Sequence, residues 1–228
     1  MRYFIVGFTF LLLVHAEEFK VYTEQNPPFN FMTNTGVQGT STELAKRLFE
    51  KAHHQFADNT ISLVPWARGY HEVLHVKNTM IYSMARTPER ETLFAWVGPI
   101  GTMRIGILAK KSHHVVLSNL KDNARYKIGT ILNTAAEQLM LEQGMNRRTL
   151  EYFTNIDSQL KKLKEDRLDG VAFSIDAMYQ LLRDMGCDLR EYEVVYVLRE
   201  SDLYFAFNQQ TDPKIIQNLN DILPTLVK

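Results

Sequence analysis

The chain contains one cysteine, Cys187, among its 228 residues. A single thiol cannot form an intrachain disulfide, so the fold must be stabilised by packing alone. Cys187 lies in a Met-Gly-Cys-Asp segment that is typical of the end of a helix, and no catalytic signature surrounds it. We therefore interpret Cys187 as a small buried residue rather than as a nucleophile.

The sequence also lacks an excess of charge of either sign. It holds 26 lysine and arginine residues against 26 aspartate and glutamate residues. Nucleic-acid and membrane-surface proteins need a basic excess, so this balance argues against both classes. The composition, with 45% hydrophobic and 23% charged residues, is typical of a globular protein and indicates no disorder. The length allows a full core or two small lobes.

No segment is long enough to span a membrane, although the first sixteen residues are unusual. Arg2 precedes an uncharged apolar run over residues 3–14, and Ala16 ends a short segment suited to cleavage. This layout is typical of a secretory signal peptide. The run is too short to cross ~30 Å of hydrocarbon at ~1.5 Å per residue, and no cysteine follows it as a lipid anchor. We expect cleavage after Ala16, which leaves a periplasmic protein with a formal net charge of −1.

Strand and helix patterns alternate along the rest of the chain. Strands are predicted over 19–23, 61–64, 80–84, 103–109, 126–131, 152–153, 170–173, 194–198 and 203–207. Helices are predicted from 40, over 66–76, from 133 or 134 to about 144, from 156, over 175–185 and from 212. Thr40-Ser41-Thr42-Glu43 predicts a capping box at the first of these helices. The alternation indicates an α/β protein with mainly parallel sheets.

Several segments, in this order, resemble the family 3 extracellular solute-binding proteins of bacterial amino-acid uptake systems. The most specific of them is Thr87-Pro88-Glu89-Arg90. The others are Pro27-Pro28-Phe29-Asn30-Phe31, Gly39, Phe94-Ala95-Trp96-Val97-Gly98-Pro99, Ile128-Gly129-Thr130, Asn133-Thr134, Asp169-Gly170-Val171 and Tyr204-Phe205-Ala206-Phe207. The resemblance covers essentially the whole chain after residue 16.

This resemblance implies a two-lobed periplasmic-binding-protein fold, also called a Venus flytrap, with two α/β lobes joined by two crossing hinge strands. Lobe 1 is expected over residues 17–102 plus 203–228, and lobe 2 over residues 103–202. Hinges are expected near 100–104 and near 199–202. The ligand is expected in the cleft between the lobes, where the carboxyl ends of the strands meet, and the lobes are expected to close around it.

The resemblance also implies which residues bind the ligand, and Arg90 is the first of them. In the family the matching arginine holds the ligand carboxylate, and a guanidinium can pair two oxygens at once. The alternative is a surface ion pair with Glu89 or Glu91. Thr134 is the second candidate, because it is expected to begin a helix whose free N–H groups attract an anion. The alternative for Thr134 is a plain N-cap, and Asn133 stands where the family usually has glycine.

Further candidates are Trp66, Arg68, Ser83, Arg86 and Glu24. Trp66 and Arg68 are expected at the start of a helix that faces the cleft, and core packing is the alternative for Trp66. Ser83 and Arg86 flank the end of a strand, and Arg86 is expected to put a second cation near Arg90. Glu24 either meets a ligand amine or is simply solvated.

The chain departs from the family pattern at three positions. Ala85 replaces a common hydroxyl residue, and Asn26 replaces the aromatic residue that commonly precedes the proline pair. Ser174 stands where the amino-acid binders commonly carry an acid for the α-amino group, and Asp176, two residues later, is a further candidate for ligand binding. We therefore expect a small anionic ligand, an amino acid or a related carboxylate, and leave open whether it carries an amine.

A zinc signature offers a function of another class. His71, Glu72 and His75 match the H-E-x-x-H pattern, in which two histidines bind zinc and the glutamate activates water. The third histidine and the glycine of the extended motif are missing, so we favour a chance match in an amphipathic helix. We expect no metal and no cofactor. A zinc hydrolase remains the alternative, as does an enzyme that acts on small organic acids with this fold.

The expected role is therefore binding rather than catalysis. The partners that the resemblance implies are a small-molecule ligand and an inner-membrane ABC permease or a sensor. We expect no nucleic acid partner and a monomeric protein.

Overall fold

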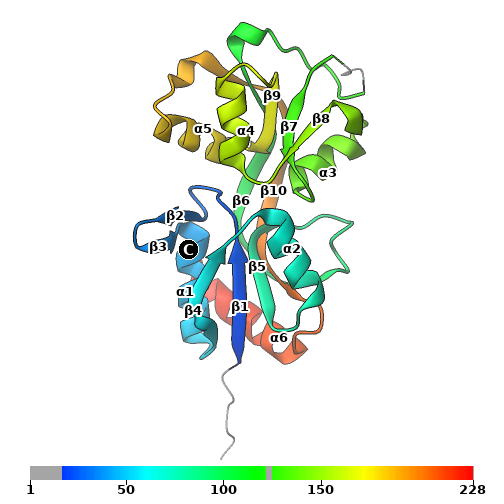
Figure 1. Ribbon diagram of the computed structural model, residues 1–228. Coiled ribbons are helices and arrows are strands. Elements are labelled where there is room, and N and C mark those ends of the chain that lie inside the picture. The colour runs from blue at the N-terminus through cyan, green and yellow to red at the C-terminus, as the bar shows by residue number, and fades with distance from the viewer. Residues whose placement is uncertain (1–16, 122–124, 228) are drawn as a thin grey trace, which may run out of the picture.

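The computed structural model describes residues 17–121 and 125–227, so the predicted signal peptide and its cleavage site after Ala16 lie outside the described residues. The main sheet has eight strands in the order β4-β1-β5-β10-β6-β9-β7-β8. Figure 1 shows these strands and their helices in two lobes, which β6 (Phe94–Lys110) and β10 (Tyr192–Asn208) connect. Within the described ranges, no helix has the length and apolar character that a membrane crossing requires.

Lobe 1 is the lower lobe in Figure 1, and helices cover both faces of its sheet. Its elements are β1 (Glu18–Thr23), β2 (Phe31–Thr33), β3 (Gly36–Gln38), α1 (Thr40–Lys51), β4 (Gln55–Leu63), α2 (Trp66–His75), β5 (Thr79–Ala85) and α6 (Pro213–Ile222). β1 pairs in parallel with both β4 and β5. Successive residues of β5 point to opposite faces, so Tyr82 packs into the cluster of α1 and α6 while Ile81 packs into that of α2.

Lobe 2 repeats this arrangement. Its elements are β7 (Ile128–Ile131), α3 (Ala135–Glu142), β8 (Leu150–Phe153), α4 (Ile156–Lys164), β9 (Gly170–Ser174) and α5 (Ile175–Asp184). Short 3-10 helices lie at Lys111–His113, Arg147–Thr149 and Leu189–Glu191, and a fourth at Leu223–Thr225 follows α6 in lobe 1. β7 pairs in parallel with β8 and β9. α3 packs into one core cluster, and α4 and α5 pack into the other.

The two connecting strands run antiparallel to each other over their whole length. Their pairing extends from Tyr192 opposite Lys110 to Asn208 opposite Phe94, and three register shifts interrupt it. The strands predicted over 103–109, 194–198 and 203–207 are therefore parts of β6 and β10. The strands that belong to one lobe alone pair in parallel, whereas β6 and β10 pair antiparallel with each other, β10 with β5 in lobe 1 and β6 with β9 in lobe 2. The predicted lobe boundaries fall inside these two strands and stay a prediction.

The start of α1 differs from the predicted capping box. The N-cap residue is Gly39, and no side chain accepts a capping hydrogen bond there. Thr42 is buried, and its hydroxyl instead contacts the Gln38 carbonyl at 3.2 Å and the Tyr82 hydroxyl at 2.7 Å. Gly39 has φ 120, and a Cβ at this position would lie 2.3 Å from the Phe29 carbonyl oxygen. Close approach of two backbones therefore determines this helix start, and the capping-box prediction was wrong.

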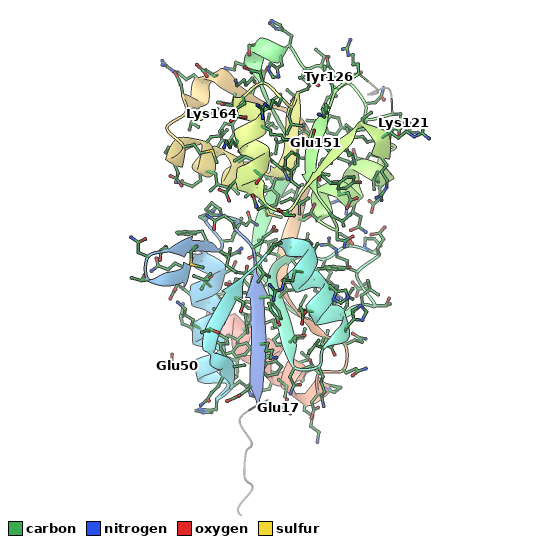
Figure 2. All side chains as sticks on the ribbon, in the orientation of Figure 1. Glu17, Glu50, Lys121, Tyr126, Glu151 and Lys164 are labelled. Atoms are coloured by element: carbon green, nitrogen blue, oxygen red, sulfur yellow. The ribbon has the colours of Figure 1, made fainter. Side chains whose placement is uncertain are left out.

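Charged side chains such as those of Glu50 and Lys121 lie on the outer surface of the two lobes (Figure 2). Cys187 follows α5 and is only partly buried. It is therefore more accessible than the small buried residue that we expected, although its thiol is free.

Candidate ligand-binding site

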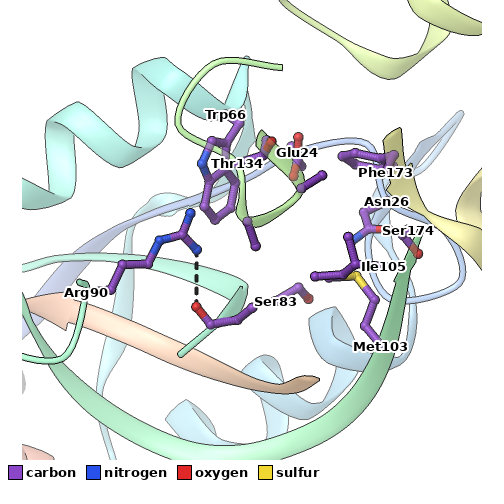
Figure 3. Close-up of a pocket in the computed structure, with 13 residues that line it drawn as sticks. Glu24, Asn26, Trp66, Ser83, Arg90, Met103, Ile105, Thr134, Phe173 and Ser174 are labelled. Carbon is purple, nitrogen blue, oxygen red and sulfur yellow. Dashed lines mark hydrogen bonds between the residues drawn. The ribbon is translucent and has the colours of Figure 1, made fainter. Parts of the chain in front are cut away.

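A small pocket lies between the two lobes. Lobe 1 contributes Glu24, Asn26, Trp66, Ser83, Ala85 and Arg90, β6 contributes Met103 and Ile105, and lobe 2 contributes Thr134, Ala135, Ala136, Phe173 and Ser174. Figure 3 shows that these side chains point toward one another from the facing lobes. The carboxyl ends of β5 and β9 meet here, as expected for a ligand site in an open α/β sheet.

Arg90 is the most buried charged residue of this pocket, with 3% of its surface exposed. Its Nη1 donates to the Ala85 carbonyl at 3.1 Å, the dashed line in Figure 3, and its Nη2 donates to the Asn133 carbonyl at 2.8 Å. The guanidinium carbon lies 5.7 Å from the centre of the Trp66 ring and 5.5 Å from that of Tyr70. Burial lowers the pKa of Arg90. Its side chain is thus positioned by neutral groups.

The surface ion pair that we considered for Arg90 is formed by Arg86 instead. Among the described residues Glu91 pairs with Arg86, whose Nε lies 2.7 Å from Glu91 Oε2, and Arg90 forms no ion pair. The Arg86 guanidinium also lies over the rings of Trp96 and Tyr204, at 5.5 and 5.4 Å. Arg86 does not line the pocket, so the expected second cation near Arg90 is absent from this lining. Ser83 and Ala85 face the pocket, and alternation along the strand directs the next residue away from it.

Trp66 and Asn133 connect the two lobes. The indole Nε1 of Trp66 donates to the Asn133 carbonyl at 2.7 Å, the same oxygen that Arg90 contacts. Asn133 has φ 62, a left-handed conformation. Its N–H donates to Glu137 Oε2 at 2.6 Å, and Tyr152 donates to the other oxygen of Glu137 at 2.8 Å. The hydrogen bonds that Asn133 forms here all use its backbone, and two of them join the lobes.

The N-terminus of α3 forms the lobe 2 wall of the pocket. Thr134 is its N-cap residue; the hydroxyl accepts from the Glu137 N–H at 3.4 Å and donates to the Ile131 carbonyl at 2.7 Å. Ala135 and Ala136 also line the pocket, and the first N–H groups of a helix have no intrahelical acceptor. The helix end therefore offers a partial positive charge to an anion on the side facing Arg90.

Glu24 follows β1 and is half-buried. Burial raises its pKa to about 8, against the opposing effect of Arg90, so its carboxyl carries a proton at neutral pH. Its main-chain oxygen accepts from Asn30 Nδ2 at 2.6 Å, and the Asn30 side-chain oxygen accepts from the Ser83 hydroxyl. Asn30 thus holds the loop after β1 against β5. Ser83 lines the pocket with φ 59, and its hydroxyl is already used by Asn30.

Besides Arg86 and Asn133, two further predicted residues lie outside the pocket. Arg68 is exposed on the first turn of α2. Asp176 leaves 53% of its side chain exposed, and its Oδ1 lies 4.0 Å from an Arg104 nitrogen. Asp176 therefore does not take the place of the acid that the amino-acid binders commonly carry at the position of Ser174. Ser174 itself lines the pocket and caps α5, accepting from the Ala177 N–H at 3.4 Å.

Several lining residues were not predicted as site residues. They are Asn26, Ala85, Met103, Ile105, Ala135, Ala136, Phe173 and Ser174. Ser174 and Phe173 end strand β9, so the rule that ligands lie at the carboxyl ends of parallel strands could have identified them. Met103 and Ile105 belong to the middle of β6, which carries no comparable signal in the sequence.

The zinc signature lies on the outer part of α2. The rings of His71 and His75 are 4.5 Å apart on an exposed face. Glu72 instead contacts Tyr22, and burial together with Glu72 raises the pKa of the Tyr22 hydroxyl. Within the part of the chain that the structure describes, no three His, Cys, Asp or Glu side chains are grouped as metal ligands.

Comparisons with known proteins agree on the fold. One similar structure is the arginine-bound form of truncated ArgBP from T. maritima, with 17% identity, a TM-score of 0.77 and coverage of 92% of this chain and 96% of that chain. Another is an ABC uptake transporter substrate binding protein from Streptococcus pneumoniae with bound histidine, with 17% identity, a TM-score of 0.78 and coverage of 92% and 86%.

A third similar structure is a histidine kinase sensor domain with similarity to periplasmic binding proteins, with 15% identity, a TM-score of 0.77 and coverage of 91% and 90%. No curated protein matches the sequence significantly. The family model of the bacterial extracellular solute-binding proteins, family 3, matches residues 19–225. Since this match spans nearly the whole chain, the protein belongs to the bacterial extracellular solute-binding proteins, family 3.

Proposed function

We propose that the protein captures a small amino acid or a related carboxylate between its lobes, with the carboxylate at Arg90. The observation that carries the proposal is a buried guanidinium that forms no ion pair within the described residues, in a pocket built from both lobes. Burying an uncompensated charge costs several kcal/mol. A ligand carboxylate would supply the missing charge and two acceptor oxygens.

The charge state of Glu24 supports an anionic ligand. With a pKa of about 8, Glu24 is neutral at pH 7 and leaves the charge of Arg90 uncompensated. The free N–H groups of α3 add to this positive potential. A ligand ammonium group beside Glu24 would favour the carboxylate form of this residue. Glu24 would then hold the amine, a role that an acid at the position of Ser174 commonly has in the amino-acid binders.

The proposed role is delivery of this ligand to an ABC permease from the periplasm, after cleavage of the signal peptide behind Ala16. Similarity to an ABC uptake transporter substrate binding protein supports delivery for transport. Similarity to a histidine kinase sensor domain supports a second candidate role, in which the closed lobes report the ligand to a sensor. We propose a monomer that binds without catalysis.

A screen of amino acids and amine-free carboxylates tests the proposal. Thermal shift finds the ligands, and calorimetry gives their affinities for the mature chain. At a hundredfold excess over the dissociation constant a bound ligand stabilises the fold by about 2.7 kcal/mol. Turnover of a bound acid would instead favour an enzyme. A screen in which neither ligand group binds would contradict the proposal.

A further inference from the structure

Asn26 is almost fully buried in the wall of the pocket, with 2% of its surface exposed. Its Nδ2 contacts only the sulfur of Met103, at 3.5 Å, and its Oδ1 has no hydrogen-bond partner among the described residues. The backbone of Asn26 is fully used, because its N–H donates to the Asn30 carbonyl at 2.7 Å and its carbonyl accepts from Phe29 and Asn30. The residue is therefore fixed in place, while its amide nitrogen has only a weak sulfur acceptor and its amide oxygen has no partner among the described residues.

An amide in this state is unfavourable for the protein alone. Buried polar side-chain atoms are nearly always hydrogen-bonded, and a thioether sulfur is a weak acceptor. An apolar residue of the same size would avoid the cost of removing the amide from water. Since the amide borders the ligand pocket, a bound molecule can supply the partner that the protein does not.

The position of Asn26 defines which part of a ligand it would meet. Figure 3 shows Arg90 and Asn26 on opposite sides of the pocket, with Ser83 between them and with Met103 and Ser174 beside Asn26. A ligand whose carboxylate lies at Arg90 therefore presents its other end to Asn26. The lining there consists of the Asn26 amide, the Ser174 hydroxyl, the Met103 thioether and the apolar side chains of Ile105 and Phe173, and none of these groups is charged.

We infer that Asn26 determines specificity, and that the ligand carries an uncharged hydrogen-bonding group, an amide or a hydroxyl, at the end opposite its carboxylate. This inference rests on the proposed function. An amide side chain offers both a donor and an acceptor, so it can pair with either group. A site that hydrogen-bonds a ligand discriminates strongly against an analogue that lacks the polar group, because its own buried amide then stays unpaired.

Size-matched ligands test the inference by calorimetry. Asparagine against leucine compares an amide with an apolar group of the same shape, and succinamate against isocaproate repeats the comparison without the amine. Glutamine against methionine and threonine against valine extend the size range. The wild type should bind the polar member of at least one pair about tenfold or more tightly than its apolar partner.

Variants then assign the preference to Asn26. Asn26→Leu should abolish or invert it while the apolar members still bind, and Asn26→Ala gives a second variant if the first does not fold. Asn218→Leu makes the same exchange on the exposed face of α6 and should keep the wild-type preference.

The outcomes separate the two proposals. Equal or stronger binding of the apolar members by the wild type, or a preference that survives in both Asn26 variants, overturns the inference and leaves the proposed function intact. If no member of any pair binds the wild type while another amino acid or carboxylate of the screen does, the inference fails and the proposed function stands. If nothing in the whole screen binds, both fail together.

Discussion

The indole nitrogen of Trp66 in lobe 1 lies 2.7 Å from the main-chain oxygen of Asn133 in lobe 2, to which it donates a hydrogen bond. Arg90 donates to the same oxygen at 2.8 Å. One carbonyl therefore holds two side chains of the opposite lobe, and both bonds break when the lobes separate. We expect these bonds to favour the arrangement in which residues of both lobes line one pocket.

Trp66→Phe should weaken ligand binding by about 2- to 10-fold, because it removes one neutral hydrogen bond worth ~0.5–1.5 kcal/mol from the closed state and keeps an aromatic ring in the pocket. Calorimetry with one ligand on both proteins measures the change. Trp96→Phe is the matched control, because the Trp96 indole donates to the Glu91 carbonyl at 3.0 Å within lobe 1. Equal losses in the two variants would contradict a role in closure.

Arg90→Ala should abolish measurable binding while the protein stays folded. Removing one partner of a desolvated ion pair costs on the order of 2–5 kcal/mol, which is ~30-fold to several-thousand-fold in affinity. Arg90→Lys should also bind poorly, since an ammonium cannot reproduce the planar two-pronged contact. Calorimetry on both variants, with exposed Arg190→Ala as the control, measures these losses. An unchanged affinity in a well-folded Arg90→Ala protein would place the ligand elsewhere.

The order of the elements could be predicted from the sequence because it depends on local patterns. The helix predicted over 66–76 and the strand predicted over 80–84 lie within one residue of α2 and β5. The continuity of β6 and β10 was missed, since both strands carry exposed residues where they cross between the lobes, such as Thr102 in β6 and Glu200 in β10. Pairing between distant segments, which no local pattern records, keeps those residues extended.

The site was predicted less completely than the fold. Arg90, Thr134, Trp66, Ser83 and Glu24 line the pocket, and the resemblance to a family suggested them. The placement of Arg86 depends on Trp96 and Tyr204, two residues from other parts of the chain that hold its guanidinium. Contacts of this kind appear only once the chain is folded.

The purified protein should contain no stoichiometric zinc, and His75→Ala should leave ligand affinity unchanged. His71 and His75 share an exposed face of α2, whereas Glu72 contacts Tyr22 and is not directed at a shared metal position. Elemental analysis and calorimetry check the two expectations. Zinc at one per chain, with peptidase activity that Glu72→Gln removes, would establish the hydrolase instead.

Glu24→Gln should stabilise the ligand-free protein relative to the wild type more at pH 8 than at pH 5. The folded protein holds the Glu24 proton up to about pH 8, whereas the usual pKa is 4.5, so unfolding releases a proton between these values. Wild-type stability therefore falls as pH rises through this window, by at most about 1.4 kcal/mol per unit. Urea unfolding at several pH values measures the difference, with Glu50→Gln on the exposed surface (Figure 2) as the control. Parallel pH curves for wild type and Glu24→Gln would contradict the raised pKa.

Binding of an amino acid near pH 6.5 should release up to one proton from Glu24, and binding of the matching amine-free acid should not. The carboxyl is protonated in the free pocket because burial raises its pKa to about 8. An ammonium group beside it favours the carboxylate and lowers this pKa, so the proton leaves on binding. Calorimetry in two buffers with different ionisation enthalpies counts the protons, because the apparent binding enthalpy then differs between the buffers. The buffer dependence of the binding enthalpy should vanish in Glu24→Gln if this variant still binds.

Two outcomes would contradict this prediction. An amino acid that binds without buffer dependence would place its amine away from Glu24. Proton release with the amine-free acid would assign the titration to the carboxylate end of the pocket.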